Sequence, residues 1–391
     1  MKEKSSSILL GAALLMATSA VGPGFLTQTT VFTKTLGASF GFVILISILI
    51  DIGVQLNIWR IIAVSELRAQ DIANKVFPGL GVFLAILILF GGLAFNIGNV
   101  AGAGLGLEAL LGINTTVGAI ISTIIAIAIF AYKQAAKAMD NFTKIMASAI
   151  ILVIIYIAFV SDPPLADAAH RTIIPVQIDF VAILTLVGGT VGGYITFAGG
   201  HRLIDAGIKG TSALPAVNKS AIMGLSIASL IRVFLFLASL GIIAQGLIID
   251  DSNPTASVFQ LAAGNFGYRL FGLVMFAAAI TSIIGSAYTS VSFIKSFHPF
   301  ITKYQNIITI IFITVSMGIF IVVGKPVNLL IIAGALNGII LPISLTVMLI
   351  AAYKPEIVGS YHQPLLLTIV GIAIVVVLAF MSGKVLFDLL F

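Results

Sequence analysis

Long runs of apolar residues separated by short polar segments dominate the pattern of this chain. A helix needs about 20 mostly apolar residues to cross a bilayer, and eleven segments meet this requirement. We therefore expect an all-α polytopic membrane protein with eleven transmembrane helices and no soluble domain. The expected spans are residues 8–36, 40–63, 80–108, 117–132, 142–160, 180–208, 217–248, 268–293, 305–323, 327–351 and 365–387.

Two of these spans are unusually long, and glycine interrupts both of them. The first contains Gly22-Pro23-Gly24, and the sixth carries four glycines in six positions, among them Gly192 and Gly193. Each glycine weakens a helix by about 1 kcal/mol relative to alanine, and proline removes a backbone hydrogen bond. Unwound backbone at membrane depth persists only where protein or a wet cavity satisfies it. We therefore predict that both helices are broken.

The two breaks occupy corresponding places in two halves of the chain. The first and sixth spans run in opposite directions, and such pairs are typical of secondary transporters with a midplane substrate site. We expect one transmembrane domain over residues 1–391, with repeats at about 8–160 and 180–351 and an extra helix at about 365–387. The alternative is that the glycines only permit close helix packing.

Charge indicates the orientation. With the N-terminus inside, 14 of the 20 lysines and arginines lie in inner loops, as the positive-inside rule requires. We expect a protein of the cell membrane, with a cytoplasmic N-terminus and an external C-terminus. The net charge of +6 then reflects one membrane face and indicates no nucleic-acid partner.

Enzyme motifs are missing from the sequence. It contains no P-loop, HExxH pair, dinucleotide fingerprint or hydrolase triad spacing, and no cysteine for a thiol metal site. We expect neither an enzyme nor a cofactor. The expected partners are a small-molecule or ion substrate and the lipid bilayer, and the oligomeric state is left open.

The breaks and the third span resemble the NRAMP family of divalent-metal transporters, which have the LeuT fold. The family's first broken helix carries Asp-Pro-Gly-Asn, where this chain has Gly22 to Phe25. Its sixth span carries Ala-Thr-Val-Met-Pro-His, where this chain has Gly-Thr-Val-Gly-Gly-Tyr at 189–194. The resemblance covers roughly residues 8–350 and implies a LeuT fold with a 5+5 inverted repeat and broken helices 1 and 6.

The positions that bind metal or protons in that family differ here. Its aspartate, asparagine and methionine are replaced by Gly22, Phe25 and Gly192, and two acidic positions of the third span by Asn96 and Asn99. Divalent cations favour carboxylate oxygens, and transition metals favour nitrogen or sulfur ligands. We therefore expect no metal site and the loss of divalent-metal transport.

A neutral site for a small organic solute is expected instead. Exposed N–H groups at a half-helix N-terminus favour an anionic group, and Phe25 and Tyr194 could cover a small organic body. The expected substrate-binding residues are Ser19, Gly22, Pro23, Gly24, Phe25, Gln28, Asn96, Thr190, Gly192, Gly193 and Tyr194.

A coupling ion is expected from two further features. Span 268–293 carries the hydroxyls of Ser282, Ser286 and Thr289, which could hold Na⁺ or instead bond their own backbone. Asp51 and Arg232 each place a charge within a span. Such charges are functional candidates, so Asp51 either carries a coupling proton or forms a structural pair with Arg232.

Three hypotheses for the function follow. The first is a secondary transporter for an amino acid or small carboxylate, coupled to Na⁺ or H⁺. The second is a transporter of Mg²⁺ or Mn²⁺ with a remodelled site, since a largely hydrated ion needs fewer protein ligands. The third is a non-transporting membrane sensor or partner subunit.

Overall fold

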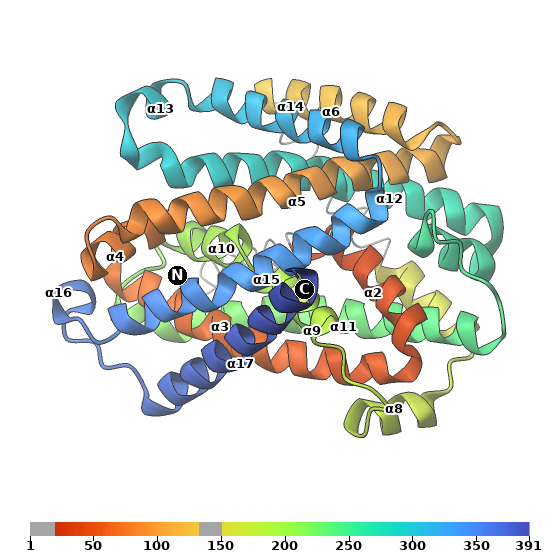
Figure 1. The fold of residues 1–391 in the computed structure, drawn as a ribbon, viewed down its shortest axis with the longest axis horizontal. Coiled ribbons are helices and arrows are strands. Elements are labelled where there is room, and N and C mark those ends of the chain that lie inside the picture. Colours follow the sequence, from red (N-terminus) through yellow and green to blue (C-terminus); the bar gives the residue numbers. More distant parts are fainter. Residues whose placement is uncertain (1–19, 133–150, 391) are drawn as a thin grey trace, which may run out of the picture.

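The computed structural model describes residues 20–132 and 151–390, and this part of the chain is helical with short connections (Figure 1). Ser19, the beginning of the first predicted span and the beginning of the fifth lie outside the described residues. The first half contains α2 (Pro23–Leu36), η1 (Gly37–Ser39), α3 (Phe40–Ser65), α4 (Ala69–Val76), α5 (Leu80–Leu111), α6 (Thr115–Ala131), the helix Ile151–Val160 and α8 (Leu165–Ile173).

The second half begins with the interrupted pair α9 and α10. Its elements are α9 (Phe180–Val191), α10 (Tyr194–Asp205), η2 (Thr211–Ala213), α11 (Leu214–Ala244), α12 (Pro254–Ile294), η3 (Lys295–Phe297), α13 (Pro299–Lys303), α14 (Gln305–Val323), α15 (Pro326–Ala351), α16 (Pro355–Val358) and α17 (Leu365–Leu390).

The helices pack in two groups with α2 and α15 between them. In Figure 1, α5, α6, α12 and α14 lie together in one half, and α3, α9, α11 and α17 lie together in the other. The helices α2 and α15 contact members of both groups. The half-helices that follow the glycine-rich stretches are therefore surrounded by protein.

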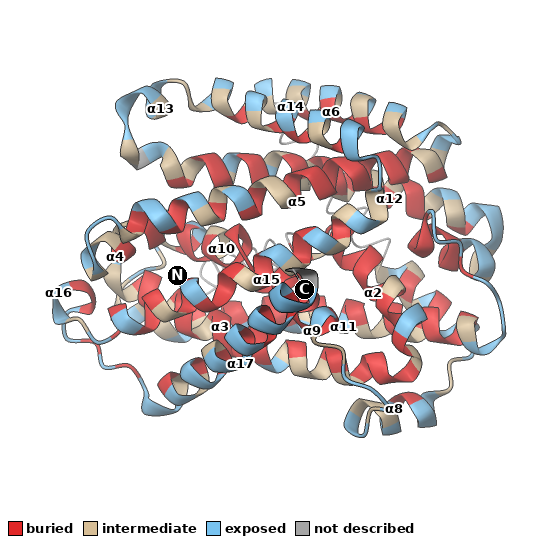
Figure 2. Ribbon diagram, viewed as in Figure 1, coloured by how far each residue is buried: buried red, intermediate tan, exposed pale blue. Residues whose placement is uncertain are grey.

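Burial follows the position of each helix. Figure 2 shows continuous burial in the middle of α5 and exposed residues along the outer helices α6, α14 and α17. Large apolar side chains such as Ile124, Val322 and Phe380 are exposed on these outer helices. Apolar surface of this extent suits a lipid environment rather than water.

Most predicted spans agree with the helices to within a few residues. Eight helical segments of the described residues are long and apolar enough to cross a membrane, and one of these, Pro23–Ser65, combines α2 and α3. The helix Ile151–Val160 and α8 form a further pair bent by 108°, and α6 is apolar but shorter. The total of eleven spans stays a prediction.

The span predicted at 268–293 corresponds to the longer part of α12. This helix begins at Pro254, loses helical geometry at Ala263 and Gly264, and then continues to Ile294. The short helical part before the bend was not predicted, because the polar residues Gln260 and Asn265 interrupt the apolar run there. Pro254 suits the first position of a helix because it lacks an N–H group.

Candidate functional site

The first break lies directly before α2. Ala20 is helical, Val21 and Gly22 are not, and Gly22 has an extended backbone with φ −101° and ψ −175°. Pro23 then opens α2. Because a helix begins here, the N–H groups of its first turn are left without intrahelical acceptors. The predicted break at Gly22-Pro23-Gly24 is confirmed.

The second break separates α9 from α10. The helix α9 ends at Val191, Gly192 is extended, and Gly193 has φ 52° and ψ −127°. This backbone conformation is strained for any residue with a Cβ atom, which explains the glycine. The N–H of Gly192 donates to the carbonyl of Gly188 at 3.1 Å, and α10 starts at Tyr194. The second predicted break is also confirmed.

Close packing accounts for another of the four glycines. A Cβ atom on Gly188 would overlap the backbone of Gly334 and Gly338 in α15. Both helices therefore carry glycines four residues apart, at 188 and 192 and at 334 and 338. This arrangement lets two backbones approach closely. Both interpretations therefore apply, at different glycines. Gly188 permits close helix packing, and Gly193 lies at the break.

A buried cation lies between the two breaks. The side chain of Arg232, in α11, is 2% exposed. Its Cζ atom lies 3.9 Å from the centre of the Phe25 ring, in the first turn of α2. Its Nη1 donates to Oγ1 of Thr190 at 3.1 Å, near the end of α9. A guanidinium over an aromatic face is a favourable cation–π contact. Arg232 therefore joins residues beside both breaks, a contact that sequence analysis did not predict.

Asp51, in α3, belongs to the same buried group. Its carboxylate interacts with Arg232 electrostatically and with the side chain of Thr190. Among the ion pairs of the described residues, none joins Asp51 directly to Arg232. The two charges therefore interact without a direct ion pair, and Thr190 contacts both groups.

The amides and hydroxyls of α5 and α12 form a second polar group. Asn96 donates through Nδ2 to the carbonyl of Ile283 at 2.7 Å and to Oγ of Ser286 at 2.8 Å. Asn99 reaches the same hydroxyl at 3.5 Å. Ser286 in turn donates to the carbonyl of Ser282 at 2.7 Å, so it both bonds its own helix and meets its neighbour.

This second group touches both breaks. A Cβ atom on Gly22 would lie 3.4 Å from Oγ of Ser282 and 3.9 Å from Oδ1 of Asn99. The side chain of Tyr194 interacts with Ser286, and its ring packs edge-on against Phe95 with centroids 5.5 Å apart. Of the predicted substrate residues, Gly22, Asn96 and Tyr194 thus lie near Ser282 and Ser286.

The remaining predicted residues divide between the site and its surroundings. Gln28 donates to the carbonyl of Leu330 at 2.8 Å, and its Oε1 lies beside Gly189. Thr289 is only partly buried, and the structure shows no contact of its side chain with either break. The aromatic rings of Phe25 and Tyr194 belong to different apolar clusters, because Phe25 faces α11 while Tyr194 faces α5.

Several buried polar atoms around the breaks have no hydrogen-bond partner among the described residues. Such atoms are rare in native interiors and call for an explanation. On the helices that meet here they are Oε1 of Gln28, Oδ1 of Asp51, Oδ1 of Asn96, Oγ1 of Thr185, Oγ1 of Thr196, Nε and Nη2 of Arg232, Oγ of Ser290 and Oδ1 of Asn337.

The C-terminal part of α10 is anchored to the start of α4. Nε2 of His201 accepts from the N–H of Ala69 at 2.9 Å. Arg68 contacts both carboxylate oxygens of Asp205, at 3.0 and 3.1 Å. Phe25, Tyr194 and Arg232 are buried as well.

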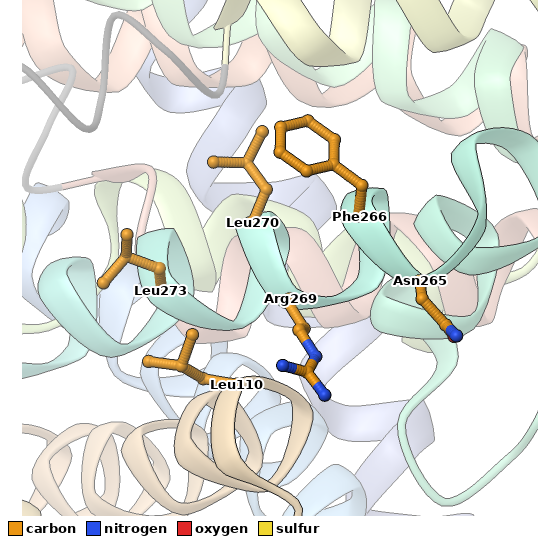
Figure 3. A pocket seen from close by; sticks show the side chains of 6 residues that line it. All are labelled: Leu110, Asn265, Phe266, Arg269, Leu270 and Leu273. Atoms are coloured by element: carbon orange, nitrogen blue, oxygen red, sulfur yellow. The ribbon is translucent and has the colours of Figure 1, made fainter.

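An apolar surface pocket of about 310 Å³ lies elsewhere, where α12 passes the end of α5. Figure 3 shows the side chains of Phe266, Arg269, Leu270 and Leu273 along α12 and that of Leu110 on the helix beside it. Its lining is apolar apart from Arg269 and Asn265, and it does not touch the breaks. Lipid suits such a pocket better than a polar solute.

In the residues that the structure describes, no group of three His, Cys, Asp or Glu side chains could hold a metal. The positions beside the breaks instead hold a guanidinium, a carboxylate, amides and hydroxyls.

Comparison with known proteins decides the family. The Nramp family, described as natural resistance-associated macrophage protein-like, matches residues 13–388. The chain belongs to the Nramp family. This Nramp protein is 59% identical over 381 residues to an uncharacterized membrane protein of Bacillus subtilis, YcsG, covering 97% of this chain and 94% of that protein. It is 55% identical to an uncharacterized membrane protein of Haemophilus influenzae, covering 96% and 95%.

Solved structures confirm the fold of this Nramp protein. A variant of the Eremococcus coleocola manganese transporter has a TM-score of 0.72 at 18% identity, covering 95% of this chain and 84% of that one. MhsT in complex with L-phenylalanine has a TM-score of 0.66 at 16% identity, covering 97% and 98%. The protein is therefore a membrane transporter with the LeuT fold.

Proposed function

We propose that this Nramp protein is a secondary active transporter of a small organic solute, an amino acid or small carboxylate, coupled to Na⁺ or H⁺. The observation that carries the proposal is Arg232, whose guanidinium lies between the two breaks and contacts Phe25 and Thr190. A fixed positive charge repels a metal cation and attracts an anion. Gly22 and Phe25 supply no carboxylate or amide ligand in compensation.

The fold is compatible with such a solute. MhsT, a structural neighbour, is solved with L-phenylalanine, so the LeuT fold accommodates an organic zwitterion in that protein. The N–H groups at the start of α2 and α10 suit a carboxylate. We further propose inverted repeats at about 8–160 and 180–351, a location in the cell membrane and a cytoplasmic N-terminus.

Uptake into proteoliposomes tests this function. We expect saturable uptake of at least one radiolabelled small carboxylate or amino acid, driven by a Na⁺ or H⁺ gradient, and no Mn²⁺ uptake above protein-free vesicles. Robust Mn²⁺ flux without uptake of any organic solute would overturn the proposal. If Asp51→Asn then weakened Mn²⁺ binding measured by calorimetry, the remodelled metal site would replace it. A protein that transports neither organic solutes nor Mn²⁺ would instead fit the sensor or partner-subunit hypothesis.

The polar group around Ser286 provides a place for the coupling ion. Oδ1 of Asn96 has no hydrogen-bond partner in the described part of the chain, and the amide nitrogen of the same side chain donates to Ser286. Neutral oxygens of this kind can bind Na⁺, whereas Asp51 could carry H⁺. We therefore place Na⁺ coupling at Ser282, Ser286 and Asn96, and H⁺ coupling at Asp51.

Substitution of Ser286 distinguishes Na⁺ coupling from H⁺ coupling. With Na⁺ coupling, Ser286→Ala should raise the Na⁺ concentration for half-maximal uptake by about tenfold, since a hydrogen-bond-strength contact to a charge is lost. Thr281→Val is the matched control, because that hydroxyl only bonds the carbonyls of Ala277 and Ala278 in its own helix. If uptake follows the pH gradient and Asp51→Asn removes this dependence, the ion is H⁺ and the Na⁺ assignment is wrong.

A further inference from the structure

The guanidinium of Arg232 is held with one edge unused. Its Nη1 donates to Thr190, and its face covers the ring of Phe25. Nε and Nη2 are buried and have no hydrogen-bond partner among the residues described. These two nitrogens form one edge of the planar group, which is the geometry that receives the two oxygens of a carboxylate.

Leaving this edge unused is costly in a protein interior. A buried charged donor without an acceptor loses its interaction with water and gains none in return. Asp51 could satisfy the edge by a direct ion pair, yet the structure shows only a longer-range interaction between the two groups. The unused edge is therefore a feature that a ligand can complete.

Asp51 adds a second requirement for the chemistry of the ligand. Its Oδ1 is buried and is likewise without a hydrogen-bond partner in the described chain, and its carboxylate shares the contact with Thr190. A free acceptor beside two free donors matches a ligand that carries a carboxylate and, next to it, a hydrogen-bond donor. A second carboxylate on the ligand would be repelled by Asp51.

We propose that the solute is a small monocarboxylate with a hydrogen-bond donor on the adjacent carbon. Nε and Nη2 of Arg232 bind its carboxylate, and Asp51 accepts from its donor. This inference rests on the proposed function and narrows its substrate class. Phe25 and Thr190 act as positioning residues, because they fix the plane of the guanidinium without using its Nε edge.

Binding of a matched series of small acids to the purified protein tests this inference. The probes are lactate, L-alanine, propionate, lactamide and malate, and the readout is calorimetric affinity. Lactate or alanine should bind about tenfold more tightly than propionate, which lacks the donor. Lactamide, without a carboxylate, and malate, with two, should each bind at least about tenfold more weakly than lactate.

Two variants separate recognition from folding. Arg232→Lys keeps the charge but loses the planar edge, so affinity for every monocarboxylate should fall at least about tenfold. Asp51→Asn should bring the affinities for lactate and propionate to within about twofold of each other while propionate binding is retained. A misfolded protein cannot lose this preference selectively. Lys219→Gln, at an exposed position of the same helix, should leave all affinities unchanged.

The results can separate a failure of this inference from a failure of the proposed function. If the wild-type protein binds organic solutes but Arg232→Lys and Asp51→Asn leave affinities and preferences unchanged, the inference is overturned and the transporter proposal stands. Equal binding of lactate, lactamide and malate would also overturn it. If the wild-type protein binds Mn²⁺ and none of the organic probes, both proposals fall.

Discussion

Replacement of Gly193 by alanine is expected to reduce solute uptake at least about tenfold while leaving some folded protein. Gly193 has φ 52°, and holding a residue with a Cβ atom in such a conformation costs about 1–3 kcal/mol. The added methyl group would also overlap the side chain of Asn337 in α15. Relief of this strain requires the connection between α9 and α10 to change shape, and in the proposed transporter this connection lies at the solute site.

Uptake and thermal stability of the same preparation provide the measurement for Gly193→Ala. Gly318→Ala is the matched control, because Gly318 lies in α14 with nothing within 4 Å of its Cβ position and no positive φ. The control should keep its uptake, and its melting temperature should stay the same or rise slightly, since alanine favours a helix. Normal uptake by Gly193→Ala would show that transport does not depend on this backbone conformation.

The broken helices could be predicted from the sequence because glycine and proline act locally. Gly192 and Gly193 in a hydrophobic run, and Gly22 before Pro23, weaken the helix wherever they lie. The structure places both breaks at these residues. The family resemblance at the same positions then led to the LeuT fold, which the structural comparisons confirm.

The contacts of the site depended on packing, which a local pattern does not contain. Phe25 was expected to face the solute with Tyr194, but it lies under Arg232 of α11. The lone arginine in the apolar run ASLIRVFLF was the feature of the sequence that pointed to this contact. It indicated a functional or paired charge, but it could not indicate which aromatic ring or hydroxyl the guanidinium contacts.

The hydroxyl groups of α12 also show that a local sequence pattern does not predict contacts between helices. A four-residue spacing puts Ser282, Ser286 and Ser290 on one face of the helix, and the structure buries Ser286 and Ser290. Thr289 follows Ser286 by three residues and Ser282 by seven, so the same spacing includes it, yet it is only partly buried. Helical spacing therefore could not separate Thr289 from Ser290, and it could not show that Asn96 would meet Ser286.

Replacement of Gly188 by valine is expected to prevent folding altogether. A Cβ atom there would overlap the carbonyl of Gly334 and the backbone nitrogen of Gly338 and lie 2.8 Å from the Cα of Gly338. These are backbone atoms, which cannot move aside by changing a rotamer. One extra methylene in a packed core already costs about 1–3 kcal/mol, and valine adds three carbon atoms where α9 and α15 cross. The two helices would have to separate.

Gel filtration in detergent and thermal unfolding measure this effect. Gly188→Val should yield no monodisperse protein, and Gly188→Ala should yield a folded protein with a lower melting temperature. Gly318→Val introduces the same side chain into α14, where nothing lies within 4 Å of the Cβ position, and should behave like the wild type. A monodisperse Gly188→Val protein with an unchanged melting temperature would contradict the close crossing of α9 and α15. Because Asn337 of α15 also contacts Gly193, this crossing fixes the second break relative to α15, so its loss would remove the site together with the fold.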